Sequence, residues 1–104
     1  MSSGIAIVGI ACRFPGANNP DEYWSTLRNG SVSVSQFSDQ ELIAEGIDAR
    51  TLQQPNYVKA NGIIANADMF DAGFFGYNAY DATMMDPQHR FFLECAWEAI
   101  ENAG

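Results

Sequence analysis

The first clear pattern along the chain is a continuous apolar run over residues 5–12, Ile-Ala-Ile-Val-Gly-Ile-Ala-Cys. A run without polar alternation is typical of a strand that is buried on both faces, with helices packed above and below it. Gly9 inside the run suggests that a neighbouring backbone approaches closely. Pro15 and Gly16 then supply turn chemistry. The pattern predicts a central strand over residues 5–12.

A helix start signal follows at residues 19–22, Asn-Pro-Asp-Glu. Asn19 suits the N-cap position, Pro20 suits the first helical position, and Glu22 is placed to complete a capping box. Tyr23, Trp24 and Leu27 share one face of this helix, which we expect to end at residues 29–30, Asn-Gly.

The polar region over residues 31–56 is weakly patterned, and we interpret most of it as surface loop. Inside it, residues 38–41, Ser-Asp-Gln-Glu, form a second candidate capping box, which predicts a short helix that Gly46 ends. Residues 57–64 alternate loosely between apolar and polar side chains and predict a short strand. Residues 70–76 are an aromatic turn region.

Two helices are predicted in the last third of the chain. Asn78 can cap a short helix through Met84 and Met85, with Asp81 favouring its positive end. Asp86 can cap a long helix with Pro87 at its first position and Gly104 just past its end.

The long helix is apolar over an arc of about 200° when residues are placed at 100° intervals. The arc consists of Phe92, Leu93, Cys95, Ala96, Trp97, Ala99, Ile100 and Ala103. A helix of this kind needs protein around more than half of its circumference, and a strand buried on both faces needs neighbouring strands. The pattern therefore predicts a single unit over residues 1–104, without an internal domain boundary, whose core is completed by residues outside this chain.

Composition narrows the range of functions. The chain has 104 residues, 47% of them hydrophobic, and a formal net charge of −8. Its five basic residues are scattered singly, so nucleic acid and anionic membranes are poor partners for it. We expect no membrane span, no signal peptide and a cytoplasmic location. Two cysteines in apolar segments do not indicate a disulfide framework.

Common cofactor and metal motifs are missing from the sequence. Its glycines do not form G-x-G-x-x-G, and no Gly-Lys-Ser/Thr is present, which argues against nucleotide binding. One His and two distant Cys cannot complete a tetrahedral metal site. We expect the chain to bind no cofactor or metal.

A thiol nucleophile with a histidine base is the most tempting catalytic interpretation. His89 and Cys95 on one helix are separated by about 9 Å of rise and about 120° of rotation, which is too far for a direct hydrogen bond. Cys12 could approach His89 only through tertiary contact. We therefore interpret Cys12 and Cys95 as buried structural thiols and His89 as a packing residue on the apolar side of its helix.

The carboxylates Glu94, Glu98 and Glu101 form one stripe along the long helix, which we interpret as solvated or facing a partner rather than as a glycosidase-like pair. Arg90 is spaced to pair with Glu94. Glu98 and Glu101 lie near the negative end of the helix, so we expect their cations to come from residues beyond Gly104. The pairs at residues 74–75, Phe-Phe, and 84–85, Met-Met, are interpreted as core or interface.

Taken together, these segments resemble the start of the ketosynthase domain (β-ketoacyl-ACP synthase) of modular type I polyketide synthases. The similarity lies in residues 5–17, Trp24, Leu27 and Gly30, residues 70–76 and 85–90, and the positions Leu93, Glu94, Trp97, Glu98, Ala99, Ala103 and Gly104. It extends over nearly the whole chain in the expected order, and only residues 31–66 match loosely.

The resemblance implies an α/β fold, the N-terminal quarter of a thiolase-like αβαβα arrangement that is incomplete in this chain. It implies a homodimeric parent that condenses acyl thioesters by decarboxylative Claisen chemistry, using the phosphopantetheine arm of an acyl carrier protein. The family's nucleophile lies in a Thr-Ala-Cys-Ser-Ser type motif, followed by two His residues, and none of these occurs here. Cys12, His89 and Cys95 correspond to scaffold positions.

No catalytic, cofactor-binding or metal-binding residue is therefore assigned to this chain. Two functions remain open. One is a structural portion of a ketosynthase, inactive alone, whose partner is the remainder of the domain. The other is a stand-alone interaction module of a synthase assembly. A small thiol enzyme that uses Cys95 is a third interpretation, which we disfavour.

Overall fold

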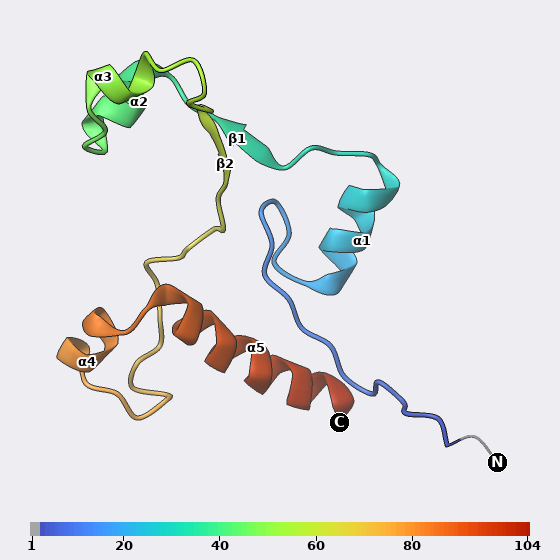
Figure 1. Cartoon of the computed structure of the whole chain (residues 1–104). Coiled ribbons are helices and arrows are strands. Elements are labelled where there is room, and N and C mark those ends of the chain that lie inside the picture. The colour runs from blue at the N-terminus through green and yellow to red at the C-terminus, as the bar shows by residue number, and fades with distance from the viewer. Residues whose placement is uncertain (1–2) are drawn as a thin grey trace.

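The computed structural model describes residues 3–104, which form five helices and two short strands. Figure 1 shows them as separate groups along a winding chain. In chain order the elements are α1 (Pro20–Arg28), β1 (Val34–Gln36), α2 (Asp39–Ala44), α3 (Ala49–Leu52), β2 (Ala60–Gly62), α4 (Ala79–Met84) and α5 (Pro87–Ala103).

Each helix begins after a residue whose side chain accepts a hydrogen bond from a backbone N–H of the first turn. The Asn19 side chain accepts the Glu22 N–H at 2.9 Å, which confirms the predicted cap of α1. The Glu22 carboxylate, however, accepts the N–H of Asn18 at 2.7 Å rather than that of Asn19. The reciprocal bond therefore lies one residue earlier than a standard capping box requires.

The capping box of α2 is complete. Ser38 Oγ accepts the Glu41 N–H at 3.3 Å, and a Glu41 carboxylate oxygen accepts the Ser38 N–H at 2.8 Å. These hydrogen bonds from Ser38 lower the pKa of Glu41. Gly46, at φ 94°, follows the helix in a conformation that glycine adopts without strain.

The predicted helices in the last third of the chain are also confirmed. Asn78 caps α4 by accepting the Asp81 N–H at 2.8 Å, and Asp86 caps α5 by accepting the Gln88 N–H at 2.8 Å. Pro87 is the first residue of α5, and Gly104 is its C-cap. Among the described residues no helix is long and apolar enough to cross a membrane.

The sheet consists of β1 and β2, which pair antiparallel with Val34 opposite Gly62 and Gln36 opposite Ala60. The predicted strand at residues 57–64 is confirmed, although β2 occupies only three of its positions. The prediction that residues 31–56 are mostly loop is wrong in two places, because β1 and α3 lie within that range. Neither element has enough residues for periodicity to reveal it.

The predicted strand over residues 5–12 is not formed. These residues are extended but belong to no ladder, and the side chains of Ile5 and Ile7 are 98% and 87% exposed. A strand needs the N–H and C=O groups of a neighbouring strand, and within residues 3–104 none runs beside this segment. The hydrophobic pattern therefore predicts that residues 5–12 are buried, but the described residues do not cover them.

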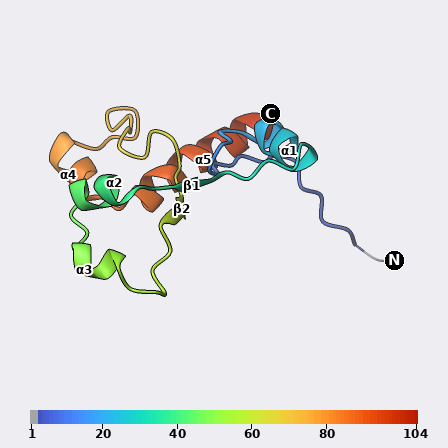
Figure 2. The ribbon, with the colours of Figure 1, turned by 90° about the horizontal axis from the view of Figure 1, so that it is seen from above.

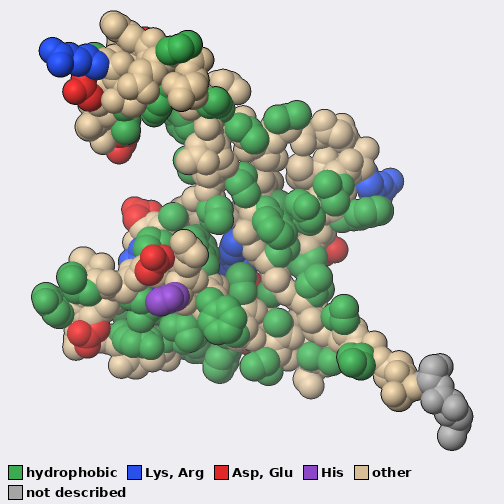
Figure 3. Space-filling model, viewed as in Figure 1, with side chains coloured by type: hydrophobic (Ala, Val, Ile, Leu, Met, Phe, Trp, Pro, Cys, Tyr) green, Lys and Arg blue, Asp and Glu red, His purple; other side chains and the backbone are tan. Residues whose placement is uncertain are grey.

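The prediction that helix α5 is nearly surrounded by protein also fails within this structure. None of its side chains is buried, and Phe92 and Ile100 are 71% and 73% exposed. Figure 3 shows hydrophobic side chains covering much of the visible face. The apolar side chains do lie along one side of α5, but most of them have no packing layer over them within the described residues.

Few side chains are shielded from solvent anywhere in the described chain. The buried hydrophobic residues are Ala17, Leu52 and Ala82. The radius of gyration is 18.3 Å, whereas a compact domain of about 100 residues has about 13 Å. Residues 3–104 therefore lack a continuous core of their own.

A long-range contact joins the N-terminal segment to the C-terminal half of α5, which lie side by side in Figures 1 and 2. The Ile10 N–H donates to Asn102 Oδ1 at 3.1 Å, across 92 positions of sequence. A Cβ built on Gly9 would lie 2.2 Å from the carbonyl oxygen of Ala99 and 2.9 Å from the Ala103 Cβ. This close approach explains the glycine and confirms the prediction made from it.

We expect Gly9→Ala to displace the N-terminal segment from α5, because the new methyl group overlaps backbone that cannot move aside. Overpacking of this kind costs about 1–3 kcal/mol. The readout is hydrogen exchange of the Ile10 amide, which should become faster in the variant. Gly4→Ala is the matched control, since nothing lies within 4 Å of a Cβ there. Equal exchange rates in the two variants would contradict the expectation.

Candidate functional site

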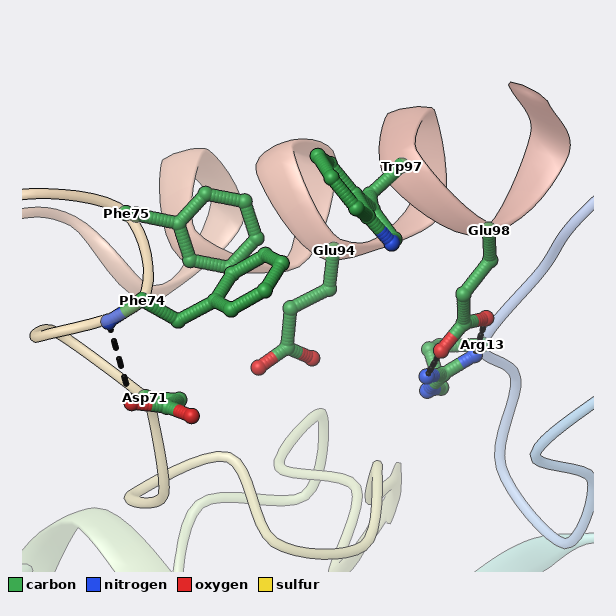
Figure 4. Close-up of a pocket in the computed structure, with 7 residues that line it drawn as sticks. All are labelled: Arg13, Asp71, Phe74, Phe75, Glu94, Trp97 and Glu98. Atoms are coloured by element: carbon green, nitrogen blue, oxygen red, sulfur yellow. Dashed lines mark hydrogen bonds and ion pairs between the residues drawn. The ribbon is translucent and has the colours of Figure 1, made fainter. Parts of the chain in front are cut away.

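The N-terminal segment is attached to α5 by an ion pair between Arg13 and Glu98. Arg13 Nη1 donates to Glu98 Oε2 at 2.8 Å, and Nη2 donates to Oε1, so the two groups meet in a two-bonded fork. Nη1 also lies within hydrogen-bond distance of the carbonyl oxygens of Asn18, at 2.8 Å, and Cys12, at 3.1 Å. The guanidinium therefore joins residues 12–18 to α5 (Figure 4).

Both members of the pair are stabilised in their charged forms. The hydrogen bond from Arg13 holds the pKa of Glu98 below its ordinary value, although partial burial acts against it. The same bond raises the pKa of Arg13. The prediction that the cation for Glu98 comes from beyond Gly104 is wrong, because the partner is a residue 85 positions earlier.

Arg90 does not form its predicted pair with Glu94. Its guanidinium points toward the carbonyl oxygens of Ala67, at 3.1 Å, and Ala82, at 3.4 Å. Arg90 thus connects the end of α4 and the loop before it to the first turns of α5. Helical spacing allowed the pair with Glu94, but the guanidinium is directed instead toward Ala67 in the loop and Ala82 in α4.

The two thiols lie close to the Arg13–Glu98 pair and are half-buried rather than fully buried as predicted. Burial raises the pKa of both Cys12 and Cys95, and the positive charge of Arg13 opposes this only in part. A thiol with a raised pKa carries little thiolate at neutral pH and is a poor nucleophile.

His89 is exposed on the first turn of α5, which corrects the prediction that it packs on the apolar side. Six residues separate it from Cys95 along the same helix, about 9 Å of rise. Within residues 3–104, no group of three or more His, Cys, Asp or Glu side chains is placed to hold a metal ion.

An open cleft of about 330 Å³ lies between the aromatic turn and α5. Figure 4 shows its walls, where Phe74 faces Trp97, Phe75 lies beside Phe74, and Glu94 projects from the helix into the space between Phe74 and Arg13. The rings of Phe74 and Trp97 are 4.7 Å apart and meet edge to face, a favourable arrangement. The interface role predicted for Phe74 is thus a contact with α5, while Phe75 packs against Phe70 and Phe74.

Asp71 completes the cleft from the turn itself. Its Oδ1 accepts the backbone N–H of Phe74 at 3.2 Å, which fixes the turn and places a carboxylate on the same cleft as Glu94. Sequence analysis did not single out Asp71, because a side-chain bond three residues along a turn leaves no periodic signal.

Comparison with known proteins places these features in a family. Residues 2–104 match the family described as "Beta-ketoacyl synthase, N-terminal domain". The chain belongs to the β-ketoacyl synthase family. The predicted resemblance to polyketide ketosynthases is confirmed.

Two curated relatives are polyketide synthases. A phenolphthiocerol/phthiocerol polyketide synthase of Mycobacterium tuberculosis is 48% identical over 102 residues, which is 98% of this chain and 7% of that protein. Polyketide synthase PksN of Bacillus subtilis is 45% identical over 104 residues, which is 100% of this chain and 2% of that protein. The chain therefore spans only a small fraction of the relatives it matches.

Solved structures show the fold. Ketosynthase twelve of the bacillaene polyketide synthase of Bacillus amyloliquefaciens superposes with a TM-score of 0.80 at 45% identity, covering 92% of this chain and 17% of that one. The oxazolomycin ketosynthase domain of Streptomyces albus gives a TM-score of 0.75 at 30% identity, covering 92% of this chain and 17% of that one. The predicted fold class, the N-terminal part of a thiolase-like ketosynthase, is thereby confirmed.

We expect Glu98→Gln to remove part of the pH dependence of stability. The pKa of Glu98 is depressed in the folded chain, so its contribution is present above the unfolded pKa of about 4.3 and is lost as the pH falls through the folded value. Because the Glu98 side chain is 41% exposed, solvent screening limits the contribution to about 1 kcal/mol or less.

The measurement is urea unfolding of the ketosynthase that carries this segment, between pH 7 and pH 3. Arg13→Lys should reproduce most of the loss at pH 7, since an ammonium group cannot make the two-bonded fork. Asp39→Asn, at the exposed Asp39–Lys59 pair, is the matched control and should change stability by a few tenths of a kcal/mol. Identical pH profiles for the Glu98 variant and the wild type would contradict the assignment.

Proposed function

We propose that residues 1–104 form one structural unit, the N-terminal portion of a polyketide synthase ketosynthase domain. The complete domain catalyses decarboxylative Claisen condensation of acyl thioesters that an acyl carrier protein presents on its phosphopantetheine arm, and it works as a homodimer. The match of residues 2–104 to the family, at 48% identity to a polyketide synthase, is the observation that carries the proposal.

The role of this portion is architectural, and the reactive groups of the domain lie elsewhere in it. A condensing nucleophile must be a thiolate beside groups that stabilise the charge of the tetrahedral intermediate. Cys12 and Cys95 have raised pKa values and lie near an ion pair in which Arg13 is bound by Glu98. His89 lies at the surface of α5's first turn. We assign no catalytic, cofactor-binding or metal-binding role to these residues.

The geometry supports a specific structural task. Arg13 and Glu98 hold the apolar segment against the C-terminal half of α5, and the contact at Gly9 sets how closely the two elements approach. The segment belongs to no ladder within residues 3–104, and Ile5 and Ile7 remain exposed. An extended apolar segment packed on a helix is what a layered α/β domain builds upon.

The chain alone should not accept an acyl group from a carrier-bound or small-molecule thioester, whereas the complete ketosynthase should become acylated. Cys12→Ala and Cys95→Ala in the complete protein should leave the extent of acylation unchanged, because neither thiol is the acceptor. Intact-protein mass spectrometry measures the acyl adduct directly. Acylation of the isolated chain, or its loss in either variant, would overturn the structural role.

A stand-alone interaction module is the competing function, and the exposed apolar side chains are the feature that favours it. Such a module must fold cooperatively by itself, but residues 3–104 bury only small patches of apolar surface. We therefore expect the isolated chain to associate or to melt without a cooperative transition. Size-exclusion chromatography and thermal circular dichroism measure this, and a monomer with a sharp transition would favour the module.

A further inference from the structure

The sequence contains two Asn-Gly steps, at residues 29–30 and 61–62. An Asn-Gly step is prone to deamidation, because the backbone nitrogen of the glycine can attack the side-chain carbonyl carbon of the asparagine without obstruction from a Cβ. The residues of both steps are exposed, so access to water does not distinguish them. The two steps differ in how the fold holds the glycine nitrogen.

At residues 61–62 the glycine nitrogen lies beside the side chain that it would attack. The Gly62 N–H donates to Oδ1 of Asn61 at 2.9 Å. Because Oδ1 is bonded directly to the carbonyl carbon Cγ, the nucleophilic nitrogen and the electrophilic carbon are already neighbours. Holding two reacting groups close together before the reaction lowers the entropic part of its barrier.

The β1–β2 ladder does not use the Gly62 nitrogen. The Phe37 N–H donates to the carbonyl oxygen of Lys59 at 2.9 Å, so these two residues are a hydrogen-bonded pair. Hydrogen-bonded and non-hydrogen-bonded pairs alternate along an antiparallel ladder, which makes Gly62 and the opposite residue Val34 a non-hydrogen-bonded pair. The Gly62 N–H therefore points away from β1, and Gly62 is the last residue of β2.

At residues 29–30 the helix end holds the glycine nitrogen instead. Asn29 is the C-cap of α1, with φ −81° and ψ −6°, and its N–H donates to the carbonyl oxygen of Ser25 at 3.0 Å. The Gly30 N–H donates to the carbonyl oxygen of Leu27 at 3.2 Å. This hydrogen bond satisfies a carbonyl group of the last turn. The Gly30 nitrogen must leave it before it can attack the Asn29 side chain.

We propose that Asn61 is a site of spontaneous deamidation in this protein and that the end of α1 protects Asn29 from the same reaction. The Gly62 nitrogen gives up its proton and bonds to Cγ of Asn61, the bond from Cγ to Nδ2 breaks, and the amide nitrogen leaves as ammonia. The product is a succinimide ring.

Water then opens this ring at either of its carbonyl groups and yields aspartate or isoaspartate. The whole reaction consumes water, releases ammonia and transfers no electrons. Isoaspartate carries the main chain through its side-chain methylene carbon, so this product lengthens the backbone inside β2.

The test uses the complete ketosynthase, kept folded in mildly alkaline buffer that is made with heavy-oxygen water. Peptide mapping by mass spectrometry measures conversion at each step. We expect conversion at Asn61 to be several-fold faster than at Asn29, with heavy oxygen in the new carboxyl group and with both aspartate and isoaspartate present. Equal conversion at the two steps, or faster conversion at Asn29, would overturn the proposal. Aspartate without isoaspartate at position 61 would also overturn it, since direct hydrolysis gives that product without a succinimide.

The same incubation in concentrated urea shows whether the fold causes the difference. Both asparagines are followed by glycine, so the two rates should become similar once the chain is unfolded. A preference for Asn61 that persists in urea would assign the effect to the neighbouring sequence and overturn the structural basis.

Two matched variants of the complete ketosynthase provide a second measurement. Asn61→Gln keeps an uncharged amide but must close a larger ring, which forms far more slowly. This variant should lose most of the isoaspartate that labelling with an isoaspartate methyltransferase detects in the folded protein, whereas Asn29→Gln should lose little. An undiminished signal in the Asn61 variant would contradict the assignment. The readout does not involve acylation, so this inference can fail or hold independently of the proposed function.

Discussion

The fork between Arg13 and Glu98 is the interaction on which the arrangement of this chain depends. It joins residues from opposite ends of the sequence. The hydrogen bond from Ile10 to Asn102 and the close approach at Gly9 belong to the same contact between the N-terminal segment and α5. Together with the Ile10–Asn102 hydrogen bond, it provides the polar attachment that orients the apolar N-terminal segment along α5. The aromatic cleft also depends on it, because Arg13 forms one end of that cleft.

This interaction also explains why two cysteines and a histidine in one short chain do not form a reactive centre. The positive charge that would favour a thiolate is committed to Glu98, and partial burial raises the pKa of both thiols. His89 lies on an exposed turn. The residues that look chemically active in the sequence therefore surround a structural contact, consistent with an architectural portion of a condensing enzyme.

The elements that sequence analysis predicted well are those whose signals act within a few residues. Caps at Asn19, Ser38, Asn78 and Asp86 were predicted because each side chain bonds to a backbone N–H two or three positions away. The elements that it missed, β1 and α3, are three and four residues long. Such segments contain only about one to one and a half periods of a hydrophobic pattern, too few to be recognised, and they form because of their neighbours.

Sequence analysis predicted the capped starts of α1, α2, α4 and α5, the close backbone contact at Gly9 and the resemblance to ketosynthases, since these depend on local chemistry or on the order of motifs. The folded chain was needed to show that Glu98 binds Arg13, that Arg90 donates to backbone carbonyls instead of pairing with Glu94, and that Asp71 and Glu94 line one cleft. Helical spacing shows which partners a side chain can reach on its own helix. It carries no information about a competing partner that the fold brings from 85 positions away.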